Sequence, residues 1–307
     1  MAQGIDSGTI VMTGATAGIG LTAVHVLSAN DRKRLIVGAR SPQTAKTVLG
    51  DEVRVLSLDL ASLESVSAFC ERVREFSPIQ SLVLNAGLNA RSTRMTEDGF
   101  DLTFQANYLS HFAIVRDLWR DLTDDAHITI TSSGTHDPAE KTPPPPPKHA
   151  DARLLAFPRN DPGRDRLGGR AAARSYTASK LCCTMLSLEL ASRRPAGTTI
   201  SFDPGLVPGT RLTREFPSFL VKLLLPIMSR TMPPDRTSTL PASAGALARL
   251  MVGSSSVGEN GDYVAMRGGH PIVVPPSEMA RNESLRGRLW DDSNALLDEV
   301  SNEKIVA

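Results

Sequence analysis

The amino-acid sequence predicts an α/β fold in which helices cover both faces of one doubly wound parallel sheet. Three observations support this prediction. Short apolar runs rich in Val, Ile and Leu alternate with longer helical runs along most of the chain. A glycine-rich turn follows the first apolar run and leads directly into a helix. Polar residues or glycines follow several later runs, as expected where parallel strands end at one sheet edge.

The expected sheet has about seven strands, with helices between them. We expect strands at residues 9–13, 34–38, 53–57, 81–84, 127–131, 198–202 and 262–265. We expect helices near residues 21–29, 42–49, 62–76, 97–120, 173–194 and 237–251, and a C-terminal helix at 277–300. Because the alternation runs through the whole chain, residues 1–307 are predicted to form a single domain.

Composition excludes several classes of protein. A hydrophobic content of 41%, a charged content of 22% and a net charge of +1 are typical of a soluble globular protein that binds neither nucleic acid nor an anionic membrane. The three cysteines, Cys70, Cys182 and Cys183, are too few for a disulfide framework and fit a reducing compartment. No run is apolar enough to span a bilayer. The six histidines show no metal-ligand spacing, so we expect a cytoplasmic protein without a metal site.

Residues 134–172 interrupt the alternation. This segment contains five successive prolines, Pro143 to Pro147, followed by Arg, Asp and Gly residues, and its first half is unsuited to a strand or helix. One interpretation is an insertion that runs over the surface beside the mouth of the site. The other is a proline-rich ligand for an SH3-type domain.

The glycine-rich turn predicts a dinucleotide site. Thr13-Gly14-x-x-x-Gly18-x-Gly20 begins where the first strand ends and continues into a helix. Glycines here permit a tight turn and let a diphosphate approach the backbone, while the helix N-terminus offers N–H groups to the phosphates. A purely structural turn is the alternative.

Tyr176 and Lys180 lie four residues apart within a helical run, so both side chains lie on one face. A free phenol has a pKa near 10. An adjacent ammonium group favours the phenolate, lowers that pKa and suits the tyrosine for acid–base catalysis. The alternative is a half-buried tyrosine beside a solvated lysine.

With these motifs in place, the chain resembles the short-chain dehydrogenase/reductase superfamily over residues 8–300, which implies a Rossmann-type fold. Asn85-Ala86-Gly87 matches the family's sheet-stabilising motif, and Pro204-Gly205 matches the turn near the nicotinamide. The resemblance implies that the catalytic residues are Asn107, Ser133, Tyr176 and Lys180, with Ser132 less suitable than Ser133. It also implies pairing of two copies through residues 97–120 and 173–194.

Several segments are similar to the branch that contains retinol dehydrogenases and protochlorophyllide reductases. They include Val37-Gly-Ala-Arg40, Asn107-Tyr-Leu-Ser-His-Phe112 and the late Leu289-Trp-Asp-Asp-Ser293. Bacterial or fungal ketoreductases of secondary metabolism share these features. Light-driven protochlorophyllide reductases normally have a cysteine directly after the Pro-Gly turn, where this chain has Leu206.

The residue after the second strand favours NADPH as cofactor. Arg40 stands where an acid would repel a ribose phosphate, and a guanidinium can bind such a phosphate through two hydrogen bonds. Asp59 resembles the residue that bonds the adenine amino group, although it could instead cap the helix that starts near Ser62. The resemblance implies cofactor contacts from Thr13, Gly14, Thr16, Ala17, Gly18, Ile19, Gly20, Arg40, Asp59, Leu60, Asn85, Ala86, Gly87, Tyr176, Lys180, Pro204, Gly205, Val207 and Thr210.

The expected reaction is reduction of a ketone or aldehyde on a hydrophobic small molecule. Ser133 and Tyr176 are expected to bind and protonate the carbonyl oxygen, Lys180 to hold the ribose, and Asn107 to help hold a water for reprotonation. Residues 206–234 are apolar and are expected to form a substrate lid, or else a lipid or subunit contact. A light-dependent reductase and a non-catalytic NADPH-binding sensor are the alternative functions. A hydrolytic triad of Ser133, His136 and Asp137 is disfavoured because the three lie on one loop without a nucleophile elbow.

Overall fold

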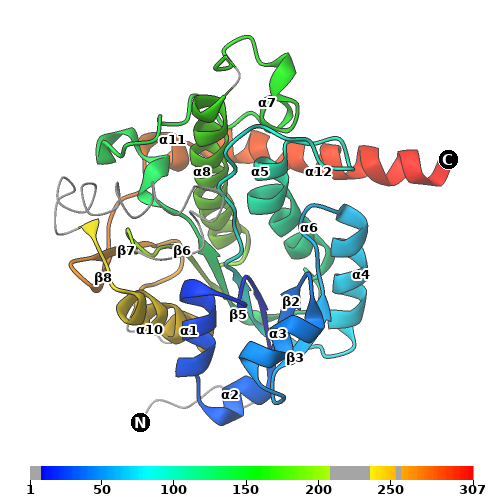
Figure 1. Cartoon of the computed structure of the whole chain (residues 1–307), viewed down its shortest axis with the longest axis vertical. Coiled ribbons are helices and arrows are strands. Elements are labelled where there is room, and N and C mark those ends of the chain that lie inside the picture. The colour runs from blue at the N-terminus through cyan, green and yellow to red at the C-terminus, as the bar shows by residue number, and fades with distance from the viewer. Residues whose placement is uncertain (1–7, 167, 208–235, 254–256, 307) are drawn as a thin grey trace.

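The computed structural model describes residues 8–166, 168–207, 236–253 and 257–306. One sheet runs through the middle of the molecule (Figure 1). Its eight strands among the described residues lie in the order β3-β2-β1-β4-β5-β6-β7-β8. Neighbouring strands are parallel up to β7, and only β8 runs antiparallel. The strands are β1 (Thr9–Thr13), β2 (Leu35–Ala39), β3 (Arg54–Ser57), β4 (Ile79–Leu84), β5 (Leu122–Thr131), β6 (Thr198–Asp203), β7 (Tyr263–Arg267) and β8 (His270–Val273). The predicted doubly wound α/β domain is therefore confirmed.

The eighth strand was not expected from the sequence. Gly268 and Gly269 join β7 to β8 in a tight turn and both have positive φ, at 54° and 81°. The four residues that follow form the edge of the sheet. This edge strand is short, contains Pro271 and has little apolar alternation, so its sequence did not predict a strand. The Gly268–Gly269 pair is the sequence feature that could have indicated a hairpin here.

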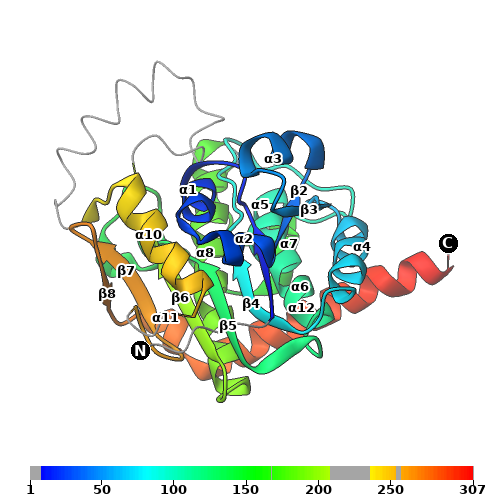
Figure 2. The same ribbon diagram turned by 90° about the horizontal axis from the view of Figure 1, so that it is seen from below.

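Helices cover both faces of the sheet, as Figures 1 and 2 show. Those described are α1 (Gly18–Val26), α2 (Ala29–Lys33), α3 (Pro42–Leu49), α4 (Leu63–Arg74), α5 (Leu102–Phe104), α6 (Ser110–Asp117), α7 (Ala152–Ala156), α8 (Gly169–Arg193), α10 (Leu240–Met251), α11 (Glu278–Arg281) and α12 (Glu283–Val306). Helices α1, α3 and α10 pack on one face and α4, α6 and α8 on the other, with α12 outside α8.

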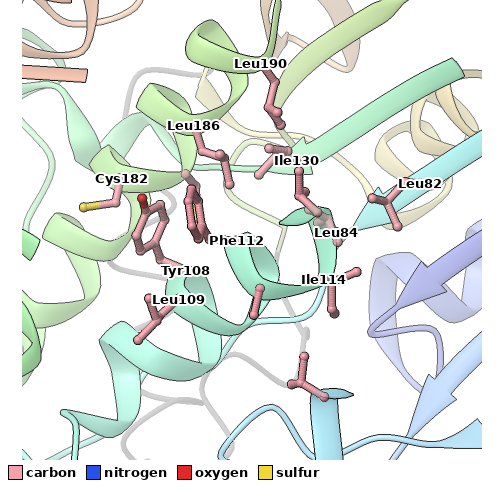
Figure 3. Close-up of a cluster of buried hydrophobic side chains, with 14 of the residues drawn as sticks. Leu82, Leu84, Tyr108, Leu109, Phe112, Ile114, Ile130, Cys182, Leu186 and Leu190 are labelled. Atoms are coloured by element: carbon pink, nitrogen blue, oxygen red, sulfur yellow. The ribbon is translucent and has the colours of Figure 1, made fainter. Parts of the chain in front are cut away.

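Alternating side chains of the central strands supply the two cores. Ile10 and Met12 of β1 face the α1 side, whereas Val11 faces the α4 side. Leu82 and Leu84 of β4 join the second core with the others labelled in Figure 3. A strand buried on both faces is apolar at every position, which is why these runs predicted a parallel sheet.

The helix predicted at 97–120 is broken into three pieces. The Asp101 carboxylate accepts hydrogen bonds from the N–H groups of Thr103 and Phe104 and so starts α5 at Leu102. Residues Gln105–Leu109 then form a π-helical turn before α6. Such turns are common at functional sites. Next to this turn, the Asn107 carbonyl accepts from the Cys183 thiol of α8 at 3.2 Å.

The predicted insertion 134–172 is packed against the rest of the domain. It contains three short 3₁₀ turns and α7, and α8 already begins at Gly169 within it. The Thr177 hydroxyl of α8 donates to the Pro145 carbonyl at 2.8 Å, and Arg174 contacts the Pro146 carbonyl. The proline run therefore lies along α8 next to Tyr176. Its value as an SH3-type ligand stays a prediction.

The predicted C-terminal helix 277–300 is two helices. Ser277 caps α11 by accepting a hydrogen bond from the N–H of Ala280. Asn282, in an extended conformation, separates α11 from α12. Trp290 of α12 packs edge-on against Phe112 of α6, with ring centroids 4.9 Å apart. The end of the chain thus crosses the outer faces of α6 and α8.

Candidate active site

The proposed site residues gather where the parallel strands end. Gly14 follows β1, Asn85 follows β4, Ser132 and Ser133 follow β5, and Pro204 follows β6. Because β1, β4, β5 and β6 are consecutive neighbours in the sheet, their ends form one continuous edge. Helix α8 brings Tyr176 and Lys180 to this edge, where both contact residues that follow or end β5.

The glycines of the first turn are required by its shape. Gly14 has a φ of +73°, and a Cβ there would lie 2.6 Å from the Ala86 Cα. A Cβ on Gly20 would lie 2.2 Å from the Gly14 carbonyl oxygen. Gly18 also has a positive φ, at +54°. Backbone therefore packs against backbone here, and any side chain would push the turn apart.

The N-terminus of α1 is open to an anion. Ala17 is the N-cap and offers no side-chain hydrogen bond, and the first turn contains no acidic residue. Thr16, Ala17 and Ile19 are half-buried around it. The first N–H groups of the helix have no intrahelical partner. This arrangement suits a diphosphate, which would be bound by backbone donors and the positive end of the helix.

Thr13 and Asn85 join β1 to β4. The Thr13 hydroxyl oxygen accepts hydrogen bonds from the N–H groups of Asn85 and Ala86, both at 3.1 Å. The Asn85 amide donates to the Gly14 carbonyl at 2.9 Å, and its oxygen accepts from the Thr131 hydroxyl at 3.1 Å. Asn85 therefore connects the ends of three strands, in keeping with the sheet-stabilising role expected of its motif.

The adenosine end of the predicted site is partly exposed. Arg40 follows β2, is exposed, and has no ion-pair partner among the described residues. Asp59 and Leu60 follow β3 and are half-buried. The helix-cap interpretation of Asp59 is wrong, because Ser62 caps α4 and the Asp59 carboxylate accepts from the N–H of Ala61 at 3.0 Å.

Tyr176 and Lys180 are both buried, at 6% and 3% exposure. The Lys180 ammonium donates to the Thr131 carbonyl at 2.8 Å and lies 5.9 Å from the centre of the Tyr176 ring. A half-buried tyrosine beside a solvated lysine is therefore not what the structure contains. The two groups face the same strand end from one helix.

Burial has the largest effect on the ionisation of both groups. It raises the pKa of the Tyr176 phenol, and a hydrogen bond with the Ser133 side chain acts in the opposite direction. Burial lowers the pKa of Lys180. The direction for Tyr176 is opposite to the lowering expected from Lys180, since the expectation took no account of how deeply the phenol is buried.

The two serines after β5 differ in their contacts. Ser132 is buried, and its hydroxyl lies 2.6 Å from the Thr184 hydroxyl and donates to the Lys180 carbonyl at 3.0 Å. Ser133 is half-buried, accepts from the N–H of Thr135 at 3.3 Å and contacts Tyr176. Of the two, only Ser133 is directed toward the phenol, which agrees with the choice made from the sequence.

Asn107 is buried, and its polar atoms already have protein partners. Its amide donates to the Leu88 carbonyl and to the Ser179 hydroxyl, both at 3.0 Å, and its side-chain oxygen accepts from the N–H of Leu88 at 2.8 Å. Gly87 lies between Asn107 and Lys180: a Cβ there would be 3.5 Å from the Asn107 oxygen and 3.4 Å from the Lys180 nitrogen. The role of Asn107 in holding a water stays a prediction.

Two buried histidines brace this edge, and neither was assigned a role from the sequence. His111 Nδ1 donates to the Asn107 carbonyl at 3.0 Å, and its Nε2 lies 3.1 Å from the Thr13 hydroxyl. Since a carbonyl can only accept, Nδ1 has the hydrogen and Nε2 accepts from Thr13. Burial is the main cause that lowers the pKa of His111 to about 3, so the ring is neutral.

His136 has an equivalent arrangement in the other half of the edge. Its Nδ1 donates to the Ser133 carbonyl at 2.8 Å, and its Nε2 accepts from the N–H of Ser277 at 3.2 Å. Burial lowers its pKa as well. Because His136 contacts the carbonyl of Ser133 and not its hydroxyl, the disfavoured hydrolytic triad is absent from this loop.

The Pro204–Gly205 turn is next to the Ser133 loop. Gly205 has a φ of +70°, and its N–H donates to the Asp203 carboxylate at 3.0 Å. Val207 is buried behind the turn. Thr210 and all but the first two residues of the predicted lid 206–234 lie outside the described residues.

Comparison with known proteins agrees with this geometry. The family model described as short chain dehydrogenase matches residues 8–143. Protochlorophyllide reductase B of Oryza sativa subsp. japonica is 30% identical over 331 aligned residues, which cover 98% of this chain and 80% of that protein. The chain belongs to the short-chain dehydrogenase/reductase superfamily. It is an oxidoreductase of the branch that resembles protochlorophyllide reductase.

Other relatives extend the comparison. Short-chain dehydrogenase iccH of Talaromyces variabilis is 28% identical, with 94% of this chain and 95% of that protein aligned. Among solved structures, an uncharacterized protein from Mycobacterium Paratuberculosis has a TM-score of 0.67 at 22% identity, covering 95% of this chain and 94% of that one. Levodione reductase has a TM-score of 0.63 at 17% identity, covering 85% and 96%. At these identities, the two structures support the fold alone.

Two searches of the described residues gave negative results. None of the helices there has the length and apolar character needed to cross a membrane. Within the same ranges, no group of His, Cys, Asp and Glu side chains could hold a metal ion.

Proposed function

We propose that this oxidoreductase uses NADPH to reduce a ketone or aldehyde on a hydrophobic small molecule to an alcohol. The contact between Ser133 and the buried Tyr176, at the sheet edge that also contains the Gly14 turn, is the observation that supports this best. It puts a hydroxyl donor and a proton donor side by side, within the edge where parallel α/β folds bind nucleotides.

The residues can divide the reaction as follows. When bound, NADPH supplies a hydride to the carbonyl carbon. Ser133 donates a hydrogen bond to the carbonyl oxygen as negative charge develops on it. Tyr176 gives its proton to that oxygen, which completes the alcohol. Lys180 would hold the nicotinamide ribose and, with Asn107, help return a proton from solvent to the phenolate. The residues that would hold the diphosphate are the glycines of the first turn.

The raised pKa of Tyr176 suits reduction. A proton donor must be protonated when the substrate arrives, and burial keeps the phenol in that form throughout the neutral range. Within the pH range in which the protein stays folded, loss of the Tyr176 proton should therefore lower the rate of reduction on the alkaline side. Oxidation of the alcohol uses the same groups in reverse.

The preference for NADPH rests on Arg40. It is exposed at the end of β2 without an ion-pair partner in the described part of the chain, so its guanidinium is free to bind a ribose phosphate. The superfamily uses NAD(P) cofactors, and the distinction between the two depends on this position. We infer a cytoplasmic enzyme from its composition.

Pairing of two copies through residues 97–120 and 173–194 needs the outer faces of α6 and α8. Here α12 of the same chain covers part of both: Phe112 of α6 packs on Trp290, and the Arg193 guanidinium of α8 lies 4.2 Å from the centre of the Trp290 ring. A homodimer built on these helices would therefore have to include α12 in its interface.

Replacing Tyr176 with Phe tests the proposed chemistry. Tyr176→Phe retains the ring and removes the proton, so kcat for a reactive ketone should fall by about 100- to 10,000-fold. Nicotinamide absorbance with NADPH and a panel of hydrophobic ketones gives the measurement, first in the dark and then under light. Tyr108→Phe is the control, because it removes another buried phenol whose hydroxyl bonds Ser293 of α12.

The outcomes separate the alternatives. Dark turnover that depends on Tyr176 supports a carbonyl reductase. Turnover that requires light would instead make the enzyme a photoreductase, although Leu206 stands where those enzymes normally have a cysteine. Nucleotide binding without turnover under either condition would favour a sensor. Equal dark rates for the parent and Tyr176→Phe would rule out Tyr176 as the proton donor.

A further inference from the structure

Asp203 is a buried carboxylate that the proposed reaction does not yet use. It is the last residue of β6 and is 3% exposed. One carboxylate oxygen accepts from the N–H of Gly134 at 3.0 Å, and the other accepts from the N–H of Gly205 at 3.0 Å. A single side chain therefore joins the loop that contains Ser133 to the turn expected at the nicotinamide end.

The peptide group between Ser133 and Gly134 is held at both ends. Its N–H donates to Asp203, and its carbonyl accepts from His136 at 2.8 Å. A Cβ on Gly134 would lie only 3.2 Å from the Asp203 oxygen, so glycine permits this close approach. A peptide fixed on two sides leaves the Ser133 side chain little freedom to move relative to Tyr176.

Charged and titratable groups surround Asp203. Arg267 of β7 lies 3.4 Å from one carboxylate oxygen and bonds Glu140 at 2.9 Å, and Glu140 also pairs with Arg236 at 3.1 Å. The groups that face Asp203 from the elements packed around it are Arg267 and Tyr263 of β7, Glu140 and His136 of the loop after β5, and Tyr176 and Lys180 of α8. Since Arg267 is shared between Asp203 and Glu140, it offsets the Asp203 charge only in part.

The charge of Asp203 reaches the proposed proton donor. Burial is the main cause that raises the pKa of Tyr176, and the Asp203 charge acts in the same direction. Burial is also the main cause that lowers the pKa of Lys180, and there the Asp203 charge acts against it. An amide at this position would remove that contribution. The pKa of Tyr176 therefore reports on the charge of Asp203, separately from its two hydrogen bonds.

We propose that Asp203 is a positioning residue for carbonyl reduction, which fixes Ser133 and the Pro204–Gly205 turn relative to each other through its two oxygens. This inference rests on the proposed function. It adds a residue outside the motifs from which the catalytic set was assigned. Both oxygens of Asp203 bond loop N–H groups, so it acts through the two loops it joins.

Two variants separate the geometric part of this role from the electrostatic part. Asp203→Asn has the same shape, but its NH₂ group cannot accept from Gly134 or Gly205, and the charge is lost. Gly134→Ala leaves the charge in place and pushes a methyl group against the carboxylate. Misplacement of catalytic groups by about 1 Å can cost about 100-fold in rate. We therefore expect kcat to fall by about 10- to 100-fold in Asp203→Asn, and by about two- to tenfold in Gly134→Ala, where a shift of a few tenths of an ångström relieves the contact.

The pH profile should distinguish the two variants. The alkaline limb of kcat should move to lower pH in Asp203→Asn, because a charge that raises the pKa of Tyr176 is gone, and should stay in place in Gly134→Ala. Tyrosinate absorbance provides a second measurement that needs no turnover: subtracting the titration of the matching Tyr176→Phe variant isolates Tyr176 among the three tyrosines. NADPH affinity should change less than kcat, because the diphosphate turn is untouched and only the Pro204–Gly205 end of the expected cofactor site bonds to Asp203.

The inference is overturned if Asp203→Asn has the parental kcat and pH profile. It is also overturned if kcat falls only in proportion to a loss of folded protein, measured by circular dichroism, with no change in the Tyr176 titration. If Asp203→Asn does not fold, a parental kcat in Gly134→Ala overturns the inference by itself. Failure of the proposed function looks different, since the parent and Tyr176→Phe would then have equal rates.

Discussion

The nucleotide half of the site and the catalytic half are built in different ways. Around β1, β2 and β4 the shape comes from backbone: Gly14 and Gly20 pack directly against neighbouring main chain, with Thr13 and Asn85 bonding the strand ends together. Around β5, α8 and β6 the shape comes from buried polar side chains such as Asp203 and His136. The first half follows from a local motif, whereas the second depends on contacts between residues distant in sequence.

This difference predicts how each half fails. A backbone-built turn has no room for a side chain and should lose its function as a whole. In the half built from side chains, a single substitution should affect catalysis or stability separately, because each side chain bonds different partners. The following substitutions test this contrast, beginning with the largest expected effect.

Gly20→Ala should abolish nucleotide binding. Its Cβ would lie 2.2 Å from the Gly14 oxygen, so the turn must open, at a cost of more than about 4 kcal/mol. Fluorescence titration with NADPH measures the loss. Gly245→Ala is the matched control, because the space around this glycine of α10 is empty and alanine favours a helix by about 1 kcal/mol. Tight binding by Gly20→Ala would contradict the idea of a backbone-built half.

Ser133→Ala and Ser132→Ala should separate catalysis from stability. Without the Ser133 hydroxyl, kcat should fall by about 100- to 1,000-fold while the melting temperature stays near that of the parent. Ser132→Ala removes a buried hydroxyl that bonds both the Lys180 carbonyl and the Thr184 hydroxyl, which then keep only the bond between them. It should cost about 1 kcal/mol of unfolding free energy. Steady-state kinetics and denaturant unfolding of both variants provide the measurements. The reverse pattern would exchange the roles given to the two serines.

Arg40→Asp should change the choice of nucleotide without affecting the catalytic half. Loss of a charge-assisted hydrogen bond to the ribose phosphate should weaken NADPH binding by about 10- to 100-fold, whereas NADH should bind no worse than before. Lys46→Asp makes the same change of charge on the exposed surface of α3 and serves as control. Equal effects of the two variants on the ratio of NADPH to NADH affinity would mean that Arg40 acts only through general charge.

His111→Asn tests the junction between the halves. In the folded state His111 has a pKa of about 3, whereas an unfolded histidine titrates near 6.5. Below pH 6.5 the unfolded chain binds a proton at His111 more readily than the folded chain does, which favours unfolding. The contribution of the neutral His111 to stability is therefore complete above pH 6.5 and is lost as the pH falls toward 3.

The unfolding free energy of the parent should therefore decline relative to that of His111→Asn by up to about 1.4 kcal/mol per pH unit within this window. Urea unfolding between pH 7 and pH 4 measures the difference. His270→Asn, at an exposed position, is the control. Parallel pH profiles for the parent and His111→Asn would show that His111 does not link the halves as a neutral group.

Features that depend on local sequence pattern were predicted correctly. Periodicity gave the parallel sheet, and the motifs gave Gly14, Asn85, Ser133, Tyr176 and Lys180, which the fold brings to one edge. These predictions missed β8, a short edge strand with little apolar alternation, and the π-helical turn at Asn107, which no spacing indicates.

The contacts of Asp203 and His136 were missed for a different reason. Asp203 meets Gly134 across 69 residues, and His136 meets Ser277 across 141. Such pairs are created only when the strands are in register, so neither residue is marked by its sequence neighbours. The raised pKa of Tyr176 was also missed, because it results from burial by residues distant in sequence.

The bond between His136 and Ser277 also has a consequence for the order of events during synthesis. A growing chain has β1, β2 and β4 and their turns by about residue 87, so all the elements that frame the diphosphate are made early. The Ser133 loop gets its last brace only after Ser277 has left the ribosome, 141 residues beyond its partner. A nascent chain therefore contains the strands and turns of the proposed diphosphate site well before it contains all the residues that position Ser133.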